Sequence, residues 1–160
     1  MPYFAAAFAR MSDMGWVGRT VDLDEVEAMD DLVDVMREFA EGDEPVLLLL
    51  EEDDEWFTIV RIEGVDDPRI FLSDLRAPLS SGLAVLVHDG IQQLMGGEEE
   101  DVASAAVEGE PGGDTDLLED LGVTSDELVE LCVEEGLLPD DALSTVAERA
   151  GFAEELEKLR

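Results

Sequence analysis

The chain has 160 residues, and 46% of them are hydrophobic, so it can fold around one good core and is not disordered throughout. Its 43 acidic residues face only 9 basic ones, which gives a formal net charge of -34. Such a surface repels nucleic acid and anionic membranes, so these binding classes are excluded and a cationic partner is favoured.

The first forty residues predict a β-hairpin and a helix. Tyr3–Arg10 alternates between two sets of apolar side chains, and Trp16–Leu23 resumes an extended pattern after a turn. Asp24 is suited to cap a helix, because apolar residues then recur at spacings of three and four until about residue 40. We expect this helix to end at Gly42.

The strongest strand signals come next. Val46–Leu50 is a continuous apolar run, typical of a strand covered on both faces, and Trp56–Ile62 alternates like a strand with one face in a core. The acidic turn Glu51–Glu55 joins them. Arg69–Leu72 predicts another short strand, and the short connections favour antiparallel pairing.

The composition changes after residue 95. Residues 77–95 predict a helix, whereas 96–114 is rich in glycine and acidic residues and predicts a linker. Residues 115–160 then predict a small helical module. Its signals are glycines at expected helix ends, a capping box and a proline in a helix first turn, namely Gly122, Gly136, Gly151, Thr124 with Glu127, and Pro139.

These elements predict an α+β fold. We expect an antiparallel sheet of about five strands with helices mainly on one face, followed by an acidic linker and a C-terminal helical module. The predicted division is a sheet domain at 1–95, the linker at 96–114 and the module at 115–160. Either the module or a second copy of the chain could cover Leu47–Leu50, so packing of the module and oligomeric state stay open.

Basic residues are unevenly distributed. No lysine or arginine lies between Arg76 and Arg149, so residues 77–148 form one acidic tract. The sheet region holds five arginines, which we interpret as pairing with carboxylates on neighbouring strands, with a local cationic patch as the alternative. They are Arg10, Arg19, Arg61, Arg69 and Arg76.

Two clusters of acidic residues are candidates for a metal site. Glu51–Glu55 and the pair Asp114 and Asp116 cluster acidic side chains, but neither has the glycine and glutamate spacing of a calcium-binding loop. We interpret both as a solvated turn or a helix cap. The sequence therefore predicts no metal ligand and no cofactor.

The reactive side chains are few. His88 is the single histidine and lies beside no nucleophile motif, so a structural role is expected. Cys132 is the single cysteine and lies among apolar residues, so we expect a small core residue. No phosphate-binding glycine loop occurs either. We assign no catalytic residue and predict that the chain is not an enzyme. No basic leader or membrane-spanning run is present, which favours the cytoplasm.

Several segments of the sequence resemble the tRNA adenosine deaminase-associated protein family of actinobacteria. The resemblance covers nearly the whole chain apart from the linker, and the segments that carry it are residues 4–10, 53–61, 69–77, 117–122 and 147–156. The resemblance implies association with the enzyme that converts the wobble adenosine of tRNA to inosine. It does not imply deamination, which needs H-x-E and P-C-x-x-C motifs. Here Asp89 and Gly90 follow His88, and Cys132 stands alone.

Two functions follow from these observations. The resemblance and the acidic tract predict an accessory or regulatory protein that binds a cationic surface, namely that of tRNA adenosine deaminase or of another basic protein. The alternative is a stand-alone protein-interaction or small-ligand-binding domain whose acidity serves solubility.

Overall fold

The computed structural model contains one antiparallel sheet of six strands. It describes residues 3–11, 15–24, 26–39, 45–52, 55–63, 68–74, 82–95, 111–133 and 138–159. The strands lie in the order β2-β1-β3-β4-β5-β6. They are β1 (Tyr3–Met11), β2 (Gly15–Thr20), β3 (Val46–Glu52), β4 (Trp56–Ile62), β5 (Arg69–Leu72) and β6 (Gly112–Gly113). The predicted α+β class is confirmed, with one strand more than expected.

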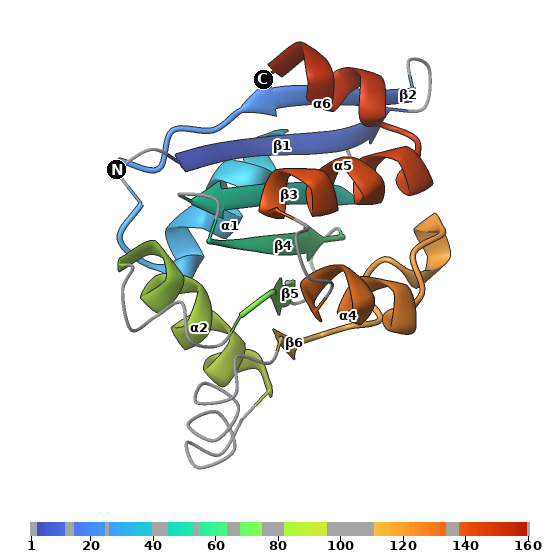
Figure 1. Cartoon of the computed structure of the whole chain (residues 1–160). Helices are drawn as coiled ribbons and strands as arrows, with labels where there is room; N and C mark the ends of the chain where they lie inside the picture. The colour runs from blue at the N-terminus through green and yellow to red at the C-terminus, as the bar shows by residue number, and fades with distance from the viewer. Residues whose placement is uncertain are drawn as a thin grey trace.

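Helices cover both faces of this sheet (Figure 1). The N-terminal helices α1 (Met29–Phe39) and α2 (Gly82–Met95) pack on one face. The other face is covered by the C-terminal segment, with a 3-10 helix and three α-helices: η2 (Glu119–Leu121), α4 (Ser125–Val133), α5 (Pro139–Ala150) and α6 (Ala153–Leu159). The two helices of the predicted sheet domain thus share one face, as expected, and the C-terminal helices, whose packing the sequence left open, cover the other face.

The alternation of strand side chains divides the core into two clusters. Even-numbered residues of β3 and β4, such as Leu48 and Val60, contact α1 and α2. Odd-numbered residues, such as Leu47 and Ile59, contact the C-terminal helices. All seven residues of β3 are buried, as its apolar run predicted. All seven of β4 are also buried, so the prediction that only one of its faces lies in a core was wrong.

The helix expected after Asp24 begins five residues later, at Met29. Asp24 is not its cap, because the residue before Met29 is Ala28, whose carbonyl accepts the first helical hydrogen bonds. The backbone N–H of Asp24 donates to the side chain of Asp22 (2.9 Å). The side chain of Asp31, inside the first turn of α1, accepts from the N–H of Glu27 (3.1 Å). The predicted end at Gly42 lies outside the described residues.

The helix signals of the C-terminal third correspond to real helix ends. Thr124 Oγ1 accepts from the N–H of Glu127 (3.2 Å) at the start of α4, and Pro139 occupies the first turn of α5. Gly122 and Gly151 end η2 and α5 in the left-handed conformation. Gly136 lies outside the described residues. The division into 1–95, 96–114 and 115–160 stays a prediction, and β6 lies at the end of the predicted linker.

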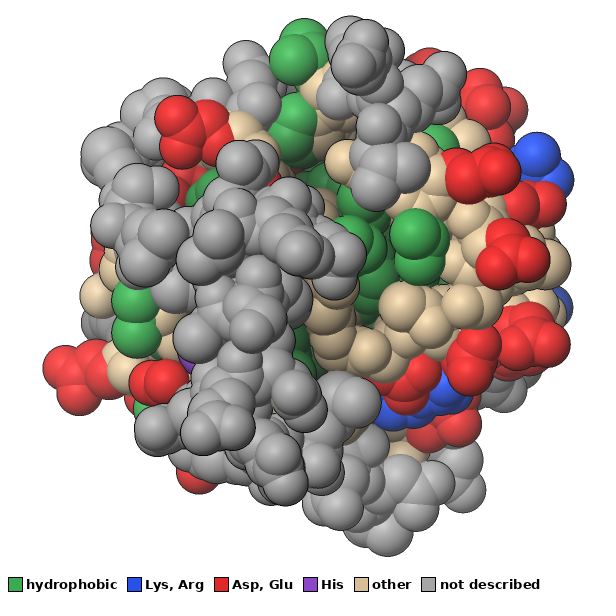
Figure 2. Space-filling model, turned by 60° about the horizontal axis from the view of Figure 1, so that its bottom comes forward, with side chains coloured by type: hydrophobic (Ala, Val, Ile, Leu, Met, Phe, Trp, Pro, Cys, Tyr) green, Lys and Arg blue, Asp and Glu red, His purple; other side chains and the backbone are tan. Residues whose placement is uncertain are grey.

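Acidic side chains are spread over the described part of the face in Figure 2, whereas basic side chains occupy a small area. Among the described helices, none is both long enough and apolar enough to cross a membrane.

Candidate functional site

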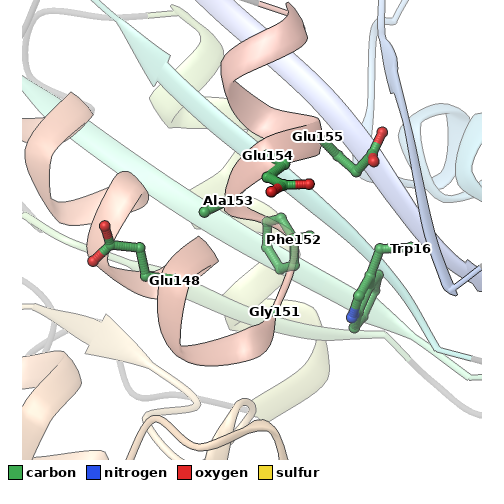
Figure 3. A pocket seen from close by; sticks show the side chains of 7 residues that line it. All are labelled: Trp16, Glu148, Gly151, Phe152, Ala153, Glu154 and Glu155. Atoms are coloured by element: carbon green, nitrogen blue, oxygen red, sulfur yellow. The ribbon is translucent and has the colours of Figure 1, made fainter.

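An open hollow lies where strand β2 meets the connection between α5 and α6 (Figure 3). Its volume is about 450 Å³. Strand β2 contributes an aromatic side chain, and the helices contribute three carboxylates. The lining residues are Trp16, Glu148, Gly151, Phe152, Ala153, Glu154 and Glu155.

The aromatic part of the hollow is held by the core. Phe152 is buried and stacks on Phe8 of β1, with ring centroids 4.5 Å apart. Trp16 also contacts Phe152, with ring centroids 5.1 Å apart and an interplanar angle of 53°. Because Trp16 remains half-buried, this arrangement presents part of an indole ring at the surface in a fixed position.

A glycine keeps the edge of this indole open. Gly151 has a φ of +101°, and its N–H donates to the carbonyl of Ala147 (2.8 Å) to end α5. A Cβ added at this position would lie 3.8 Å from Trp16 Nε1. The same residue thus turns the chain from α5 into α6 and leaves space beside the indole N–H.

The three carboxylates differ in their surroundings. Glu155 lies 3.4 Å from Lys158 on the same helix. Glu148 and Glu154 are exposed and have no ion pair within the described part of the chain. Glu154 and Glu155 project from α6, whereas Glu148 lies on the other side of Phe152 from Trp16 (Figure 3). An aromatic face with carboxylates around it is suited to bind a cation.

The predicted acidic turn at Glu51–Glu55 has a different structure. Glu51 and Glu52 are the last residues of β3 and are 8% and 4% exposed, so the interpretation as a solvated turn was wrong for them. The carboxylate of Glu52 accepts a bond from Trp56 Nε1 (3.4 Å). Glu55 is exposed in a turn, as expected, and residues 53–54 lie outside the described residues.

Of the predicted sheet arginines, Arg69 pairs with Asp114, directly after its neighbouring strand β6, while Arg61 pairs with Asp120 and Glu63, and Arg76 lies outside the described residues. Arg61 donates to the Leu117 carbonyl (2.6 Å) and to both carboxylate oxygens of Asp120 (2.5 and 2.8 Å), and it also bonds Glu63. These hydrogen bonds lower the pKa of Asp120 and raise that of Arg61. Elsewhere, Arg19 lies over the Phe39 ring, 5.2 Å from its centroid.

Asp114 makes the same kind of contact, with Arg69. Arg69 Nε donates to its carboxylate (2.6 Å), and this hydrogen bond lowers the pKa of Asp114. Asp114 also accepts from the N–H of Asp116 (3.0 Å). Among the residues that the structure describes, no group of three or more His, Cys, Asp or Glu side chains is placed to hold a metal ion.

His88 and Cys132, the single histidine and the single cysteine of the chain, both lie partly buried on helices. His88 is half-buried on α2, and its Nε2 has no hydrogen-bond partner in the described structure. The Cys132 thiol donates to the Leu128 carbonyl (3.4 Å), and burial, with a smaller effect of Asp74, raises its pKa to about 12. A thiol with this pKa stays protonated and is a poor nucleophile.

Sequence reasoning did not single out the hollow. Its lining comes from positions more than 130 residues apart, and no spacing motif joins them. The available signals were weak: a tryptophan near the start of a predicted strand, and acidic residues on both sides of a helix-ending glycine.

Comparison with known proteins gave two matches. A family model described as Rv3753c-like tRNA adenosine deaminase-associated protein matches residues 3–153. Protein Rv3753c of Mycobacterium tuberculosis is 34% identical over 111 residues, which are 69% of this chain and 61% of that protein. The chain therefore spans about three fifths of the length of this curated relative. No solved structure matches the chain.

Proposed function

Because the chain belongs to the Rv3753c-like tRNA adenosine deaminase-associated protein family, we propose that it is a non-catalytic accessory protein of tRNA adenosine deaminase. The observation that carries the proposal is the match of the family model over residues 3–153. The family description names an association with the deaminase, and the cytoplasm, where the sequence favours placing this chain, is the proposed location.

Charge supports the way in which the two proteins would associate. An enzyme that binds tRNA presents lysine and arginine to the phosphates. A chain with 43 acidic and 9 basic residues is attracted to such a surface over a long range. In this proposal the chain docks on the basic surface of the deaminase and competes there with tRNA.

The sequence lacks the motifs that perform deamination, and this favours an accessory role. Zinc deaminases hold the metal and the acid/base glutamate through H-x-E and P-C-x-x-C segments. In this chain Asp89 and Gly90 follow His88, and Cys132 is the single cysteine.

The proposal is tested with the purified chain and the tRNA adenosine deaminase of the same organism. Sedimentation velocity at low ionic strength should show a complex that dissociates as NaCl is added, because salt screens charge attraction. Added tRNA should displace the chain from the enzyme. A mixture that sediments as two separate species at every ionic strength would refute the proposal.

A further inference from the structure

The hollow beside β2 combines two features that act on the same type of ligand. Trp16 offers part of an indole ring, which packs against the buried Phe152. Glu154 offers a carboxylate with no ion pair among the described residues. An indole quadrupole and a carboxylate both attract a cation, and the hollow has room for a long cationic side chain.

We propose that this hollow binds an arginine side chain of a partner protein. The guanidinium stacks on the indole of Trp16 and donates hydrogen bonds to Glu154. Its planar, weakly hydrated fork suits an aromatic face and a carboxylate at once, whereas the compact ammonium of lysine is more strongly hydrated. The identity of the partner as the deaminase rests on the proposed function, but the arginine site itself does not.

Among the described basic side chains, Lys158 and Arg10 come near the hollow without being among its lining residues. Lys158 pairs with Glu155 (3.4 Å). Arg10 is the cross-strand neighbour of Trp16 in the β1/β2 register, so it extends from the same sheet face, and it is exposed. Neither is paired with Glu154, which leaves that carboxylate for an external cation.

The test uses the full chain and the peptide Ac-Gly-Arg-Gly-NH2, followed by NMR. The indole N–H signal of Trp16, assigned with a Trp16→Phe variant, should shift as the peptide is added. The signal of Trp56 should stay in place, because that side chain is 1% exposed and bonded to Glu52. The same peptide with citrulline, which keeps the shape but has no charge, should not shift the Trp16 signal, and the lysine peptide should bind more weakly.

Two variants of α6 form a matched pair. Glu154→Gln removes a lining carboxylate, and Glu157→Gln removes an exposed carboxylate of the same helix that does not line the hollow. We expect Glu154→Gln to weaken arginine binding by about threefold or more, and Glu157→Gln to change it by less than about twofold.

Equal effects of the two variants, or a Trp16 signal that does not respond to the arginine peptide, would overturn the arginine site. This outcome is separate from the fate of the proposed function. A chain that binds the arginine peptide but forms no complex with the deaminase keeps the site and loses the proposed partner, and the reverse result loses the site alone.

Discussion

Arg61 is the most deeply buried charged side chain in the described structure, with 3% of the residue exposed. The other odd-numbered residues of β4, Phe57 and Ile59, point into the core on the face that the C-terminal segment covers. The guanidinium reaches the start of that segment and bonds the Leu117 carbonyl and Asp120. A single side chain of β4 therefore holds the η2 turn against the sheet, across 59 residues of sequence.

The Arg61–Asp120 pair predicts a stability difference that depends on pH. Asp120→Asn should lower the free energy of unfolding by about 1 kcal/mol near neutral pH, a modest value because the Asp120 side chain is 61% exposed. Arg61 lowers the pKa of Asp120 from its ordinary value of 3.8. The carboxylate thus stabilises the fold fully above that value, and the effect is lost as the pH falls through the lower folded pKa.

The measurement is urea unfolding at several pH values, with Glu119→Gln as control. Glu119 is an exposed acidic neighbour in the same turn, and its side chain has no ion pair among the described residues. The difference between the two variants should be present at pH 7 and fade in acid well below the ordinary pKa. A difference that stays constant with pH would show that the charge of Asp120 does not stabilise the turn.

At the scale of elements, the short strand β6 connects the two halves of the chain. Gly112 and Gly113 pair with Leu72 and Phe71 of β5, and the next residue bonds the Ile70 carbonyl through its N–H (2.7 Å). Two glycines beside a glutamate-rich run are typical of a linker. In the structure, the lack of side chains at Gly112 and Gly113 instead allows the backbone of β6 to approach β5 closely.

Gly113 should tolerate no side chain. Its φ is +97°, and a Cβ would overlap the carbonyl oxygen of Ile70. Gly113→Ala should therefore lower the free energy of unfolding by about 2 kcal/mol or more. The control is Gly82→Ala at the start of α2, where an added Cβ meets no atom of the described residues within 4 Å, and its effect should stay within about 0.5 kcal/mol.

Chemical denaturation of both variants gives the comparison. If Gly113→Ala unfolded at the same denaturant concentration as Gly82→Ala, the close approach of β6 to β5 would not exist in solution.

At the scale of the whole molecule, charge and burial act against each other. The sheet is buried on both faces by helices, which supplies the apolar contacts of two clusters. A net charge of -34 destabilises the compact state by self-repulsion. Salt shortens the screening length from about 10 Å at 0.1 M to about 3 Å at 1 M, so it relieves this repulsion.

Added NaCl should therefore raise the melting temperature, by about 5 °C or more between low and molar salt. The same salt should weaken the proposed complex with the deaminase, so stability and the proposed association should respond in opposite directions. Differential scanning calorimetry of the free chain measures the first effect, and choline chloride, a second monovalent salt, should give a similar rise. A melting temperature independent of ionic strength would contradict the role of self-repulsion.

The sequence by itself determined the α+β class, the fully buried strand β3, the capped helices of the C-terminal third and the family, whose resemblance the family model confirmed. These features depend on local patterns, namely apolar runs, capping residues and short segments typical of the family. Only the tertiary structure decided that the second sheet face is covered from within the chain, that Glu51 and Glu52 are buried, and that Trp16 meets α6. Each of these depends on contacts between residues far apart in sequence, which no local pattern encodes.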